Sequence, residues 1–334
     1  MTVKGNHKLK LLYIRDILKK YSDEENPISA EKICSYLQNY GINAERKSVY
    51  NDISILSEYG YNIIRSYGTN AGYFLTDRAY ELAELRLLCD AVQAADFISA
   101  KKTKQLVEKI LMQASISKAE KIKKQVYVDN RQKCSNEEIY YIIDMLDDAI
   151  NSKKMVSIIY RKRVITDDNK AVFEEKKHII SPYAMIWSND HYYLVCNNSK
   201  YDNLMVNRID RIKQVETLEN TVSRPFSEVS SYKTSFDSAD YANKHFNMFA
   251  GEPKPVELIC SECIIESILD KFGDNANITK YGENRLLLKA DVAVSEGLVA
   301  WVMQFGNDIQ VKSPVELKNL VLEKIELIKS AYTI

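Results

Sequence analysis

The chain has 334 residues, which is more than one hydrophobic core usually holds, so we expect several domains. It is 46% apolar and 28% charged, and its 46 basic and 46 acidic side chains balance. These values exclude disordered and collagen-like classes, and they provide no bulk positive charge that would by itself indicate nucleic-acid binding. No apolar run approaches the ~20 residues of a membrane-spanning helix, and the six cysteines are scattered, so we expect a cytoplasmic protein with reduced thiols.

Three short helices and a hairpin are predicted at the N-terminal end. Residues 8–21 have an amphipathic helical pattern, and Ser29 is a suitable N-cap for a second helix. A third helix is predicted from about Glu45 to Tyr59, before Gly60. Two β-prone runs then flank a glycine-containing turn at 68–72. This order predicts a winged helix-turn-helix DNA-binding domain over residues 1–76.

In such a domain, the early residues of the third helix enter the major groove of DNA. Arginine can bind guanine and asparagine can bind adenine, whereas lysine, serine and tyrosine can bind phosphate. The alternative is that this domain makes only protein contacts and that its basic residues are solvated. Tyr67 and Thr69 are further candidates in the wing. The predicted DNA-binding residues are Arg46, Lys47, Ser48, Tyr50, Asn51 and Arg65.

Residues 77–151 are predicted to form a helical connector. Apolar residues recur at helical spacing over 78–125 and again over 136–151. This pattern is typical both of a spacer and of a dimerisation element, and both interpretations stay open.

The hydrophobic pattern of the remaining sequence divides it into three segments. Residues 152–220 alternate with a period of two, which predicts a small all-β domain, and residues 221–250 are polar enough for a linker or a strapping loop. Residues 251–334 follow a β-α-β-β-α-β ferredoxin-like order with an added terminal helix. The expected fold class is therefore multi-domain α+β.

Two motifs in the β region carry a family resemblance. They are His191-Tyr192-Tyr193-Leu194 and Arg208-Ile209-Asp210-Arg211-Ile212. The segment resembles the WYL domain, an SH3-like β-barrel of the Sm type with a Trp-Tyr-Leu triplet and a later Arg-x-x-Arg-Ile strand. Tyr192 stands where the family has Trp, and His178 stands where an Arg is common. The flanking parts resemble a helix-turn-helix of type 11 and a WCX extension.

The resemblance implies a transcription regulator whose barrel senses a nucleotide or single-stranded nucleic acid. Aromatic faces stack on bases and guanidinium groups hold phosphates, which suits such a ligand. Because side chains alternate along a strand, Tyr192 and Tyr193 point to opposite faces, and one of them is expected in the core. The ligand-binding residues implied by the resemblance are His178, Tyr183, Tyr192, Tyr193, Arg208 and Arg211.

Neither an enzyme nor a metal site is expected. Cys260 and Cys263 form one Cys-x-x-Cys pair with no second pair, so we expect buried, inert thiols. The acidic pairs at 167–168 and 174–175 flank a turn, which is typical of a solvated rim. No phosphate-binding loop, zinc-protease helix or nucleophile elbow occurs, so no catalytic residue, metal or cofactor is predicted.

Three functional hypotheses remain at this point. The first is a homodimeric regulator that binds an operator in duplex DNA and responds to the ligand in the barrel. The second is an accessory protein that binds single-stranded nucleic acid through the barrel and docks a partner through the winged helix. The third is a redox sensor that acts through Cys260 and Cys263.

Overall fold

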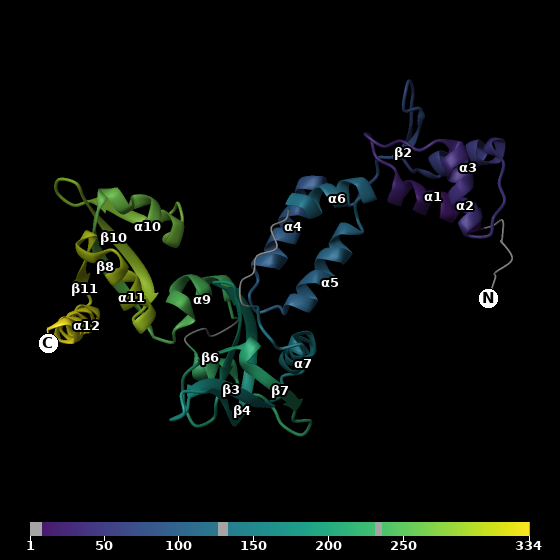
Figure 1. Ribbon diagram of the computed structural model, residues 1–334. Helices are drawn as coiled ribbons and strands as arrows, with labels where there is room; N and C mark the ends of the chain where they lie inside the picture. The colour runs from purple at the N-terminus through teal and green to yellow at the C-terminus, as the bar shows by residue number, and fades with distance from the viewer. Residues whose placement is uncertain (1–8, 126–132, 231–235, 334) are drawn as a thin grey trace. The chain divides into compact units, whose positions relative to one another are not determined.

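The computed structural model describes residues 9–125, 133–230 and 236–333. Its internal contacts divide the chain into two compact units, residues 1–135 and 136–334 (Figure 1). Both helices and sheets are present, as expected for an α+β protein. Within the described ranges, no helix has the length and apolar character needed to cross a membrane.

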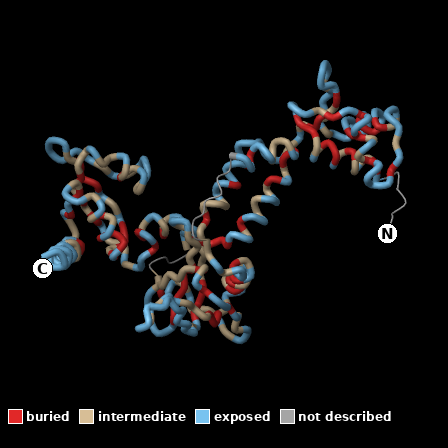
Figure 2. Tube along the Cα trace, in the orientation of Figure 1, coloured by how far each residue is buried: buried red, intermediate tan, exposed pale blue. Residues whose placement is uncertain are grey.

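The first unit begins with the predicted order of three helices and a hairpin. Ser29 caps the second helix by accepting a hydrogen bond from the backbone N–H of Lys32, and Gly60 ends the third helix with a left-handed φ of 117°. Side chains from all three helices and the second strand bury one apolar core, shown red in Figure 2. The elements are α1 (Lys10–Tyr21), α2 (Ala30–Asn39), α3 (Arg46–Tyr59), β1 (Ile63–Ser66) and β2 (Gly72–Leu75).

The helical pattern of residues 78–125 is divided among three helices. The chain leaves the helical conformation at Ala95, and Ser99 then caps the next helix. A second break follows Met112. The breaks let the short helices fold against one another around a small core that includes Leu85, Cys89 and Leu111. The helices are α4 (Leu82–Ala94), α5 (Ala100–Leu111) and α6 (Ile116–Gln125).

Polar contacts fasten the three-helix part of this unit to α5 and α6. Arg78 donates hydrogen bonds to the carbonyl oxygens of Ser22 at 2.7 Å and Lys19 at 3.0 Å, and reaches that of Gln113 at 3.5 Å. The buried Asp23 carboxylate accepts from the Ser115 hydroxyl. Burial alone would raise the pKa of Asp23, but the hydrogen bonds that it accepts lower this pKa below its ordinary value.

The second unit begins with α7 (Ile139–Asn151), which the sequence pattern assigned to the connector. Its apolar face, with Ile139, Ile142 and Leu146, is fully buried, and the helix contacts β4 and β7. The helix therefore packs with the sheet that follows it. Periodicity reveals an apolar face but does not identify which neighbour covers that face.

The five-stranded sheet that follows α7 in the second unit is antiparallel, open and curled. In the described strands, β6 and β7 form the two edges of the order β6-β5-β4-β3-β7 and are not paired with each other. A flat sheet would separate these edges by about 19 Å, but the four residue steps from Arg208 to Ile212 span at most ~14 Å, so the sheet must curl. The closed barrel that was expected is thus not found. The strands are β3 (Val156–Ile165), β4 (Ala171–Ser188), β5 (His191–Asn197), β6 (Met205–Arg208) and β7 (Ile212–Thr217), with the 3-10 turn η2 (Ile209–Arg211) between the last two.

A strap of short helices follows the sheet. Tyr241 and Met248 are buried beside Ile186 and Val195 of the sheet, whereas Phe246 is buried in the core of the C-terminal module. The strap therefore contributes side chains to two cores, as a strapping loop would and a solvated linker would not. Its elements are α8 (Phe226–Val229), α9 (Ser238–Lys244) and η3 (Phe246–Met248).

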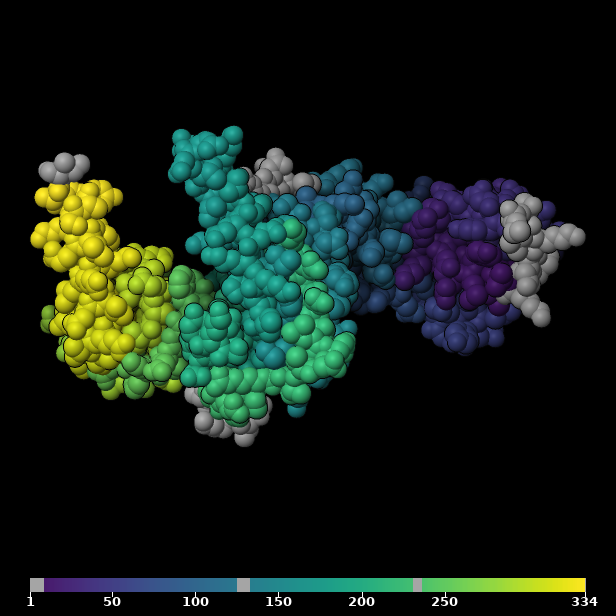
Figure 3. Space-filling view, turned by 90° about the horizontal axis from the view of Figure 1, so that it is seen from below, coloured from purple at the N-terminus to yellow at the C-terminus, as the bar shows by residue number. Residues whose placement is uncertain are grey.

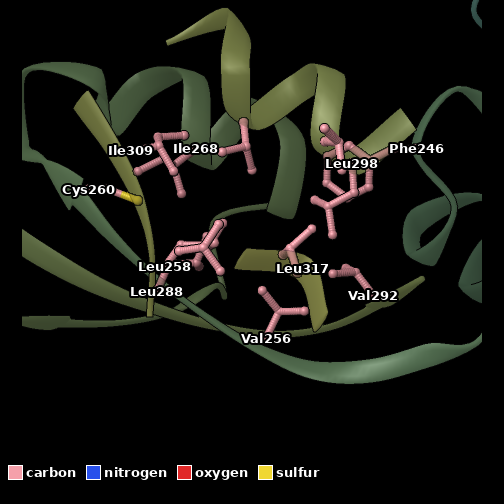
Figure 4. Packing of buried hydrophobic residues seen from close by; sticks show 13 residues of the cluster. Phe246, Val256, Leu258, Cys260, Ile268, Leu288, Val292, Leu298, Ile309 and Leu317 are labelled. Carbon is pink, nitrogen blue, oxygen red and sulfur yellow. The ribbon is translucent and has the colours of Figure 1, made fainter. Parts of the chain in front are cut away.

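The C-terminal module has the predicted β-α-β-β-α-β order. Its antiparallel sheet has the order β11-β8-β10-β9, and its core includes Leu258, Leu288 and Leu298 (Figure 4). The last helix buries Leu317, and its far end stands clear of the sheet, in yellow in Figure 3. The elements are β8 (Pro253–Ser261), η4 (Glu262–Ile264), α10 (Ile265–Phe272), β9 (Asn277–Lys280), β10 (Arg285–Ala293), α11 (Glu296–Gln304), η5 (Gly306–Asp308), β11 (Ile309–Ser313) and α12 (Val315–Tyr332).

Candidate functional site

The first candidate surface is the N-terminal half of α3. Val49, Ile53 and Leu56 face the core, so the helix turns its other side to solvent. That side carries a basic, polar and aromatic set without an apolar stripe. Its exposed members are Arg46, Lys47, Tyr50 and Asn51, all of them predicted DNA-binding residues.

Ser48 differs from the other predicted residues of α3 because its hydroxyl is engaged inside the unit. The half-buried side chain accepts a hydrogen bond from the Lys10 ammonium group of α1. Lys10 also pairs with Asp52, with Nζ and Oδ2 2.7 Å apart and both side chains nearly buried. These contacts hold α3 on α1, so the structure gives Ser48 a role in orienting α3.

The hairpin places a second basic and aromatic group beside α3. The Arg65 guanidinium lies 5.1 Å from the ring centre of Tyr67 and 5.9 Å from that of Tyr73. The Tyr73 ring in turn lies 6.1 Å from the ring of Tyr50 on α3. Sequence reasoning selected Arg65, Tyr67 and Tyr50 but missed Tyr73, although a hairpin register that pairs 65 with 73 would have indicated it.

The second candidate surface lies on the sheet of the second unit. Tyr193 of β5 and Arg208 of β6 are cross-strand partners, so their side chains share one face. Burial raises the pKa of the Tyr193 hydroxyl, and the nearby Arg208 charge acts in the opposite direction. Arg208 makes a bidentate ion pair with Asp210, at 3.0 Å and 2.7 Å. A ring and a fixed guanidinium therefore lie side by side, and together they can receive a planar or anionic ligand.

Of the other residues named for the ligand, Arg211 acts on this pair, because its charge opposes the rise in the pKa of Tyr193. Tyr192 points to the opposite face, where burial and then the Asp147 carboxylate of α7 raise its pKa. Tyr193 packs against the buried cluster that includes Val195 and Tyr241, so Tyr193 is the core member of the tyrosine pair. The half-buried His178 is paired with Ile158 in the β3–β4 ladder. Arg211 is exposed in the η2 turn.

Tyr183 occupies a position that ties the strap to the sheet. Its hydroxyl donates to the carbonyl oxygen of Arg224 at 2.9 Å, and its ring packs edge-on against Phe226 at 5.1 Å. Burial raises the pKa of Tyr183 to about 12, so the hydroxyl keeps its proton at neutral pH. This contact gives Tyr183 a structural task whether or not a ligand binds nearby.

The two cysteines of the Cys-x-x-Cys motif lie in different environments. Cys260 is fully buried in the C-terminal core, and burial raises its pKa to about 11. Cys263 is exposed, contrary to the expectation that both thiols are buried, because it lies in the η4 turn beyond the strand. Both thiols are free. A protonated, buried Cys260 is a poor redox partner, which argues against the redox hypothesis.

Comparison with known proteins identifies the two modules of the second unit. The WYL domain model matches residues 141–217 and the WCX domain model matches residues 254–328. No curated protein matches the chain. A similar solved structure is that of proteasome accessory factor B/C (PafBC) of Arthrobacter aurescens, with 12% identity, a TM-score of 0.28, and coverage of 99% of this chain and 50% of that chain. This chain thus spans half the length of that protein. The chain therefore contains a WYL domain followed by a WCX domain.

Proposed function

We propose that the chain is a cytoplasmic transcription regulator that reads duplex DNA with a winged helix in residues 1–76. The observation that carries this proposal is the exposed N-terminal half of α3, where Arg46, Lys47, Tyr50 and Asn51 reach solvent beside Arg65 of the hairpin. These side chains can bind guanine, adenine and phosphate, and a helix of this kind fits the major groove. The WYL and WCX matches support the same class of protein.

The WYL-type sheet is the proposed sensor of a nucleotide or of single-stranded nucleic acid. Tyr193 supports this because its ring can stack on a base, and Arg208 supports it because its guanidinium can hold a phosphate. Arg208 is already paired with Asp210, so an anionic ligand would have to share or displace that carboxylate. Such a ligand switches the protein only if it binds one conformation more tightly than the other.

The DNA-reading role is tested by replacing Arg46 and Lys47 together with alanine. The control variant replaces Lys101 and Lys104, two exposed cations of α5, and removes the same total charge. Binding of a labelled duplex from the region upstream of the protein's own gene is measured by fluorescence anisotropy. The first variant should lose at least about tenfold in affinity, and the control should lose much less because it removes no contact to base edges. Equal losses in the two variants would contradict the reading role of α3.

The competing function is that of an accessory protein that binds a single strand through the sheet. The placement of Tyr193 beside Arg208 is the observation that favours it, since this pair suits unpaired bases as well as a free nucleotide. Arg208→Ala separates the two functions. In the regulator, the variant keeps its affinity for the operator and loses the response to ligand, whereas in the accessory protein it loses nucleic-acid binding outright.

A homodimer is proposed as the working form, because two winged helices can read two half-sites. The C-terminal helix α12 supports this. Leu322 is 50% exposed, Ile325 45% and Ile328 43%, so one side of its far half is apolar and uncovered in the described unit. Apolar patches of this kind are typical of protein interfaces.

A further inference from the structure

One face of the β1–β2 hairpin continues from the core of the first unit to the solvent beside α3. Ile63 and Leu75 are paired near the base of the hairpin and pack in the core. Two positions further along, on the same face, Arg65 is paired with Tyr73. Because side chains alternate along a strand, the side chains of this second pair lie on the same face as the first pair and face α3 at the edge of the core.

The four side chains at this edge form a continuous series. Tyr67 and Tyr73 are the rings nearest to the Arg65 guanidinium, at 5.1 Å and 5.9 Å, and Tyr73 is 6.1 Å from Tyr50 of α3. Both distances from the guanidinium fall within the ~6 Å over which a cation and a ring attract each other. Tyr67 is 75% exposed and Tyr50 is 45% exposed, so the series borders solvent along its length.

Tyr73 is the member of the hairpin whose backbone is also bound to the segment before α2. Its N–H donates to the carbonyl of Ile28 at 2.8 Å, and its carbonyl accepts from the N–H of Ile28 at 3.0 Å. Gly72 lies against the same segment so closely that a Cβ would be 2.6 Å from the Ile28 carbonyl carbon. The ring of Tyr73 therefore starts from an anchored backbone and lies opposite Arg65 in the ladder, whereas Tyr67 lies beyond β1 toward the free end of the hairpin.

We propose that Tyr73 is a positioning residue that holds Arg65 of the hairpin and Tyr50 of α3 in one fixed relation, so that both contact the backbone of the same duplex. The inference rests on the proposed DNA-binding function and adds a specific role for a residue outside the predicted set. An arginine side chain loses rotational freedom about several bonds when it binds phosphate, and a ring that restrains the side chain beforehand lowers this entropic cost of binding. The contribution of Arg65 to the affinity for duplex DNA should therefore depend on Tyr73.

A double-mutant cycle tests this dependence in the full-length protein. Affinity for the labelled upstream duplex is measured for wild type, Arg65→Ala, Tyr73→Ala and the double variant. Each single change should lower affinity about tenfold, and the double change should lower it by little more than one single change, because coupled residues are not additive. Arg65→Ala should also reduce the slope of log K against log salt by about 0.9, the value of one phosphate contact.

Two further variants separate positioning from folding. Tyr73→Phe keeps the ring and should bind close to wild type. Tyr59→Ala removes another exposed tyrosine of α3, 81% exposed, and should leave binding unchanged. Additive losses of about 100-fold in the double variant, or a loss in Tyr73→Phe equal to that in Tyr73→Ala, would overturn the proposal while duplex binding by wild type still stood. Absence of duplex binding by the wild-type protein would instead overturn the proposed function itself, and this inference with it.

Discussion

Arg78 joins the C-terminal end of α1 to the end of α5, so its replacement by alanine should destabilise the whole first unit. The change removes two short charge-assisted hydrogen bonds, at 2.7 Å and 3.0 Å, and a third of 3.5 Å that contributes little. Bonds of this type contribute about 1.5–3 kcal/mol each when buried. Because Arg78 is only half-buried and water can replace part of the interaction, we expect a total loss of about 2 kcal/mol in the free energy of unfolding.

Urea unfolding can locate this loss within the molecule. Both tryptophans, Trp187 and Trp301, lie in the second unit, so their fluorescence follows that unit, whereas far-ultraviolet circular dichroism follows the helices of both. In Arg78→Ala the dichroism transition of the first unit should move down by about 1 M urea, and the fluorescence transition should stay in place. Lys20→Ala, which removes an exposed lysine of α1, should shift neither by more than about 0.3 M. A shift in Arg78→Ala no larger than that of Lys20→Ala would refute the reasoning.

Three further predictions concern the second unit. Burial lowers the pKa of His245, so the folded protein favours the neutral imidazole, and the free energy of unfolding measured by fluorescence should fall as pH drops below about 6.5. The variant His245→Asn should make this free energy less dependent on pH. An unchanged pH dependence in the variant would contradict the prediction. Gly297→Ala should lower the midpoint of the same transition, because its Cβ would lie 2.2 Å from the Phe246 carbonyl oxygen; an unshifted midpoint would show that the strap is not packed there. Ile325→Glu combined with Ile328→Glu should convert a dimer into a monomer in light scattering, and a dimer that persists would place the interface elsewhere.

Much of the fold follows from local patterns in the sequence. Ser29 and Gly60 mark helix ends through capping chemistry that depends only on neighbouring residues, and both have those roles in the structure. The strand and helix order of the C-terminal module likewise follows from periodicity. The covering of α7 by the sheet and the insertion of Phe246 into the C-terminal core depend on contacts between distant segments, and periodicity carries no information about them.

The candidate sites were predictable to a smaller extent. The exposed side of α3 could be predicted because the apolar positions of the helix leave one side free. The hydrogen bond between Lys10 and Ser48 could not, because it joins residues of two helices that are 38 positions apart in the sequence. On the sheet, alternation alone separated Tyr192 from Tyr193. The pairing of Tyr193 with Arg208 required the register of β5 and β6, which the motif does not contain.

The most direct test of the proposed function compares the binding of two labelled probes by the wild-type protein over a series of salt concentrations. One probe is the duplex upstream of its own gene and the other is a single strand of the same sequence, each measured by fluorescence anisotropy against unlabelled competitors. Phosphate contacts weaken steeply with salt, so contacts to base edges are revealed by selectivity that persists as salt rises. The regulator function predicts sequence-selective duplex binding at moderate salt. Tight single-strand binding with only nonselective duplex binding would contradict it and would assign the main function to the WYL-type sheet.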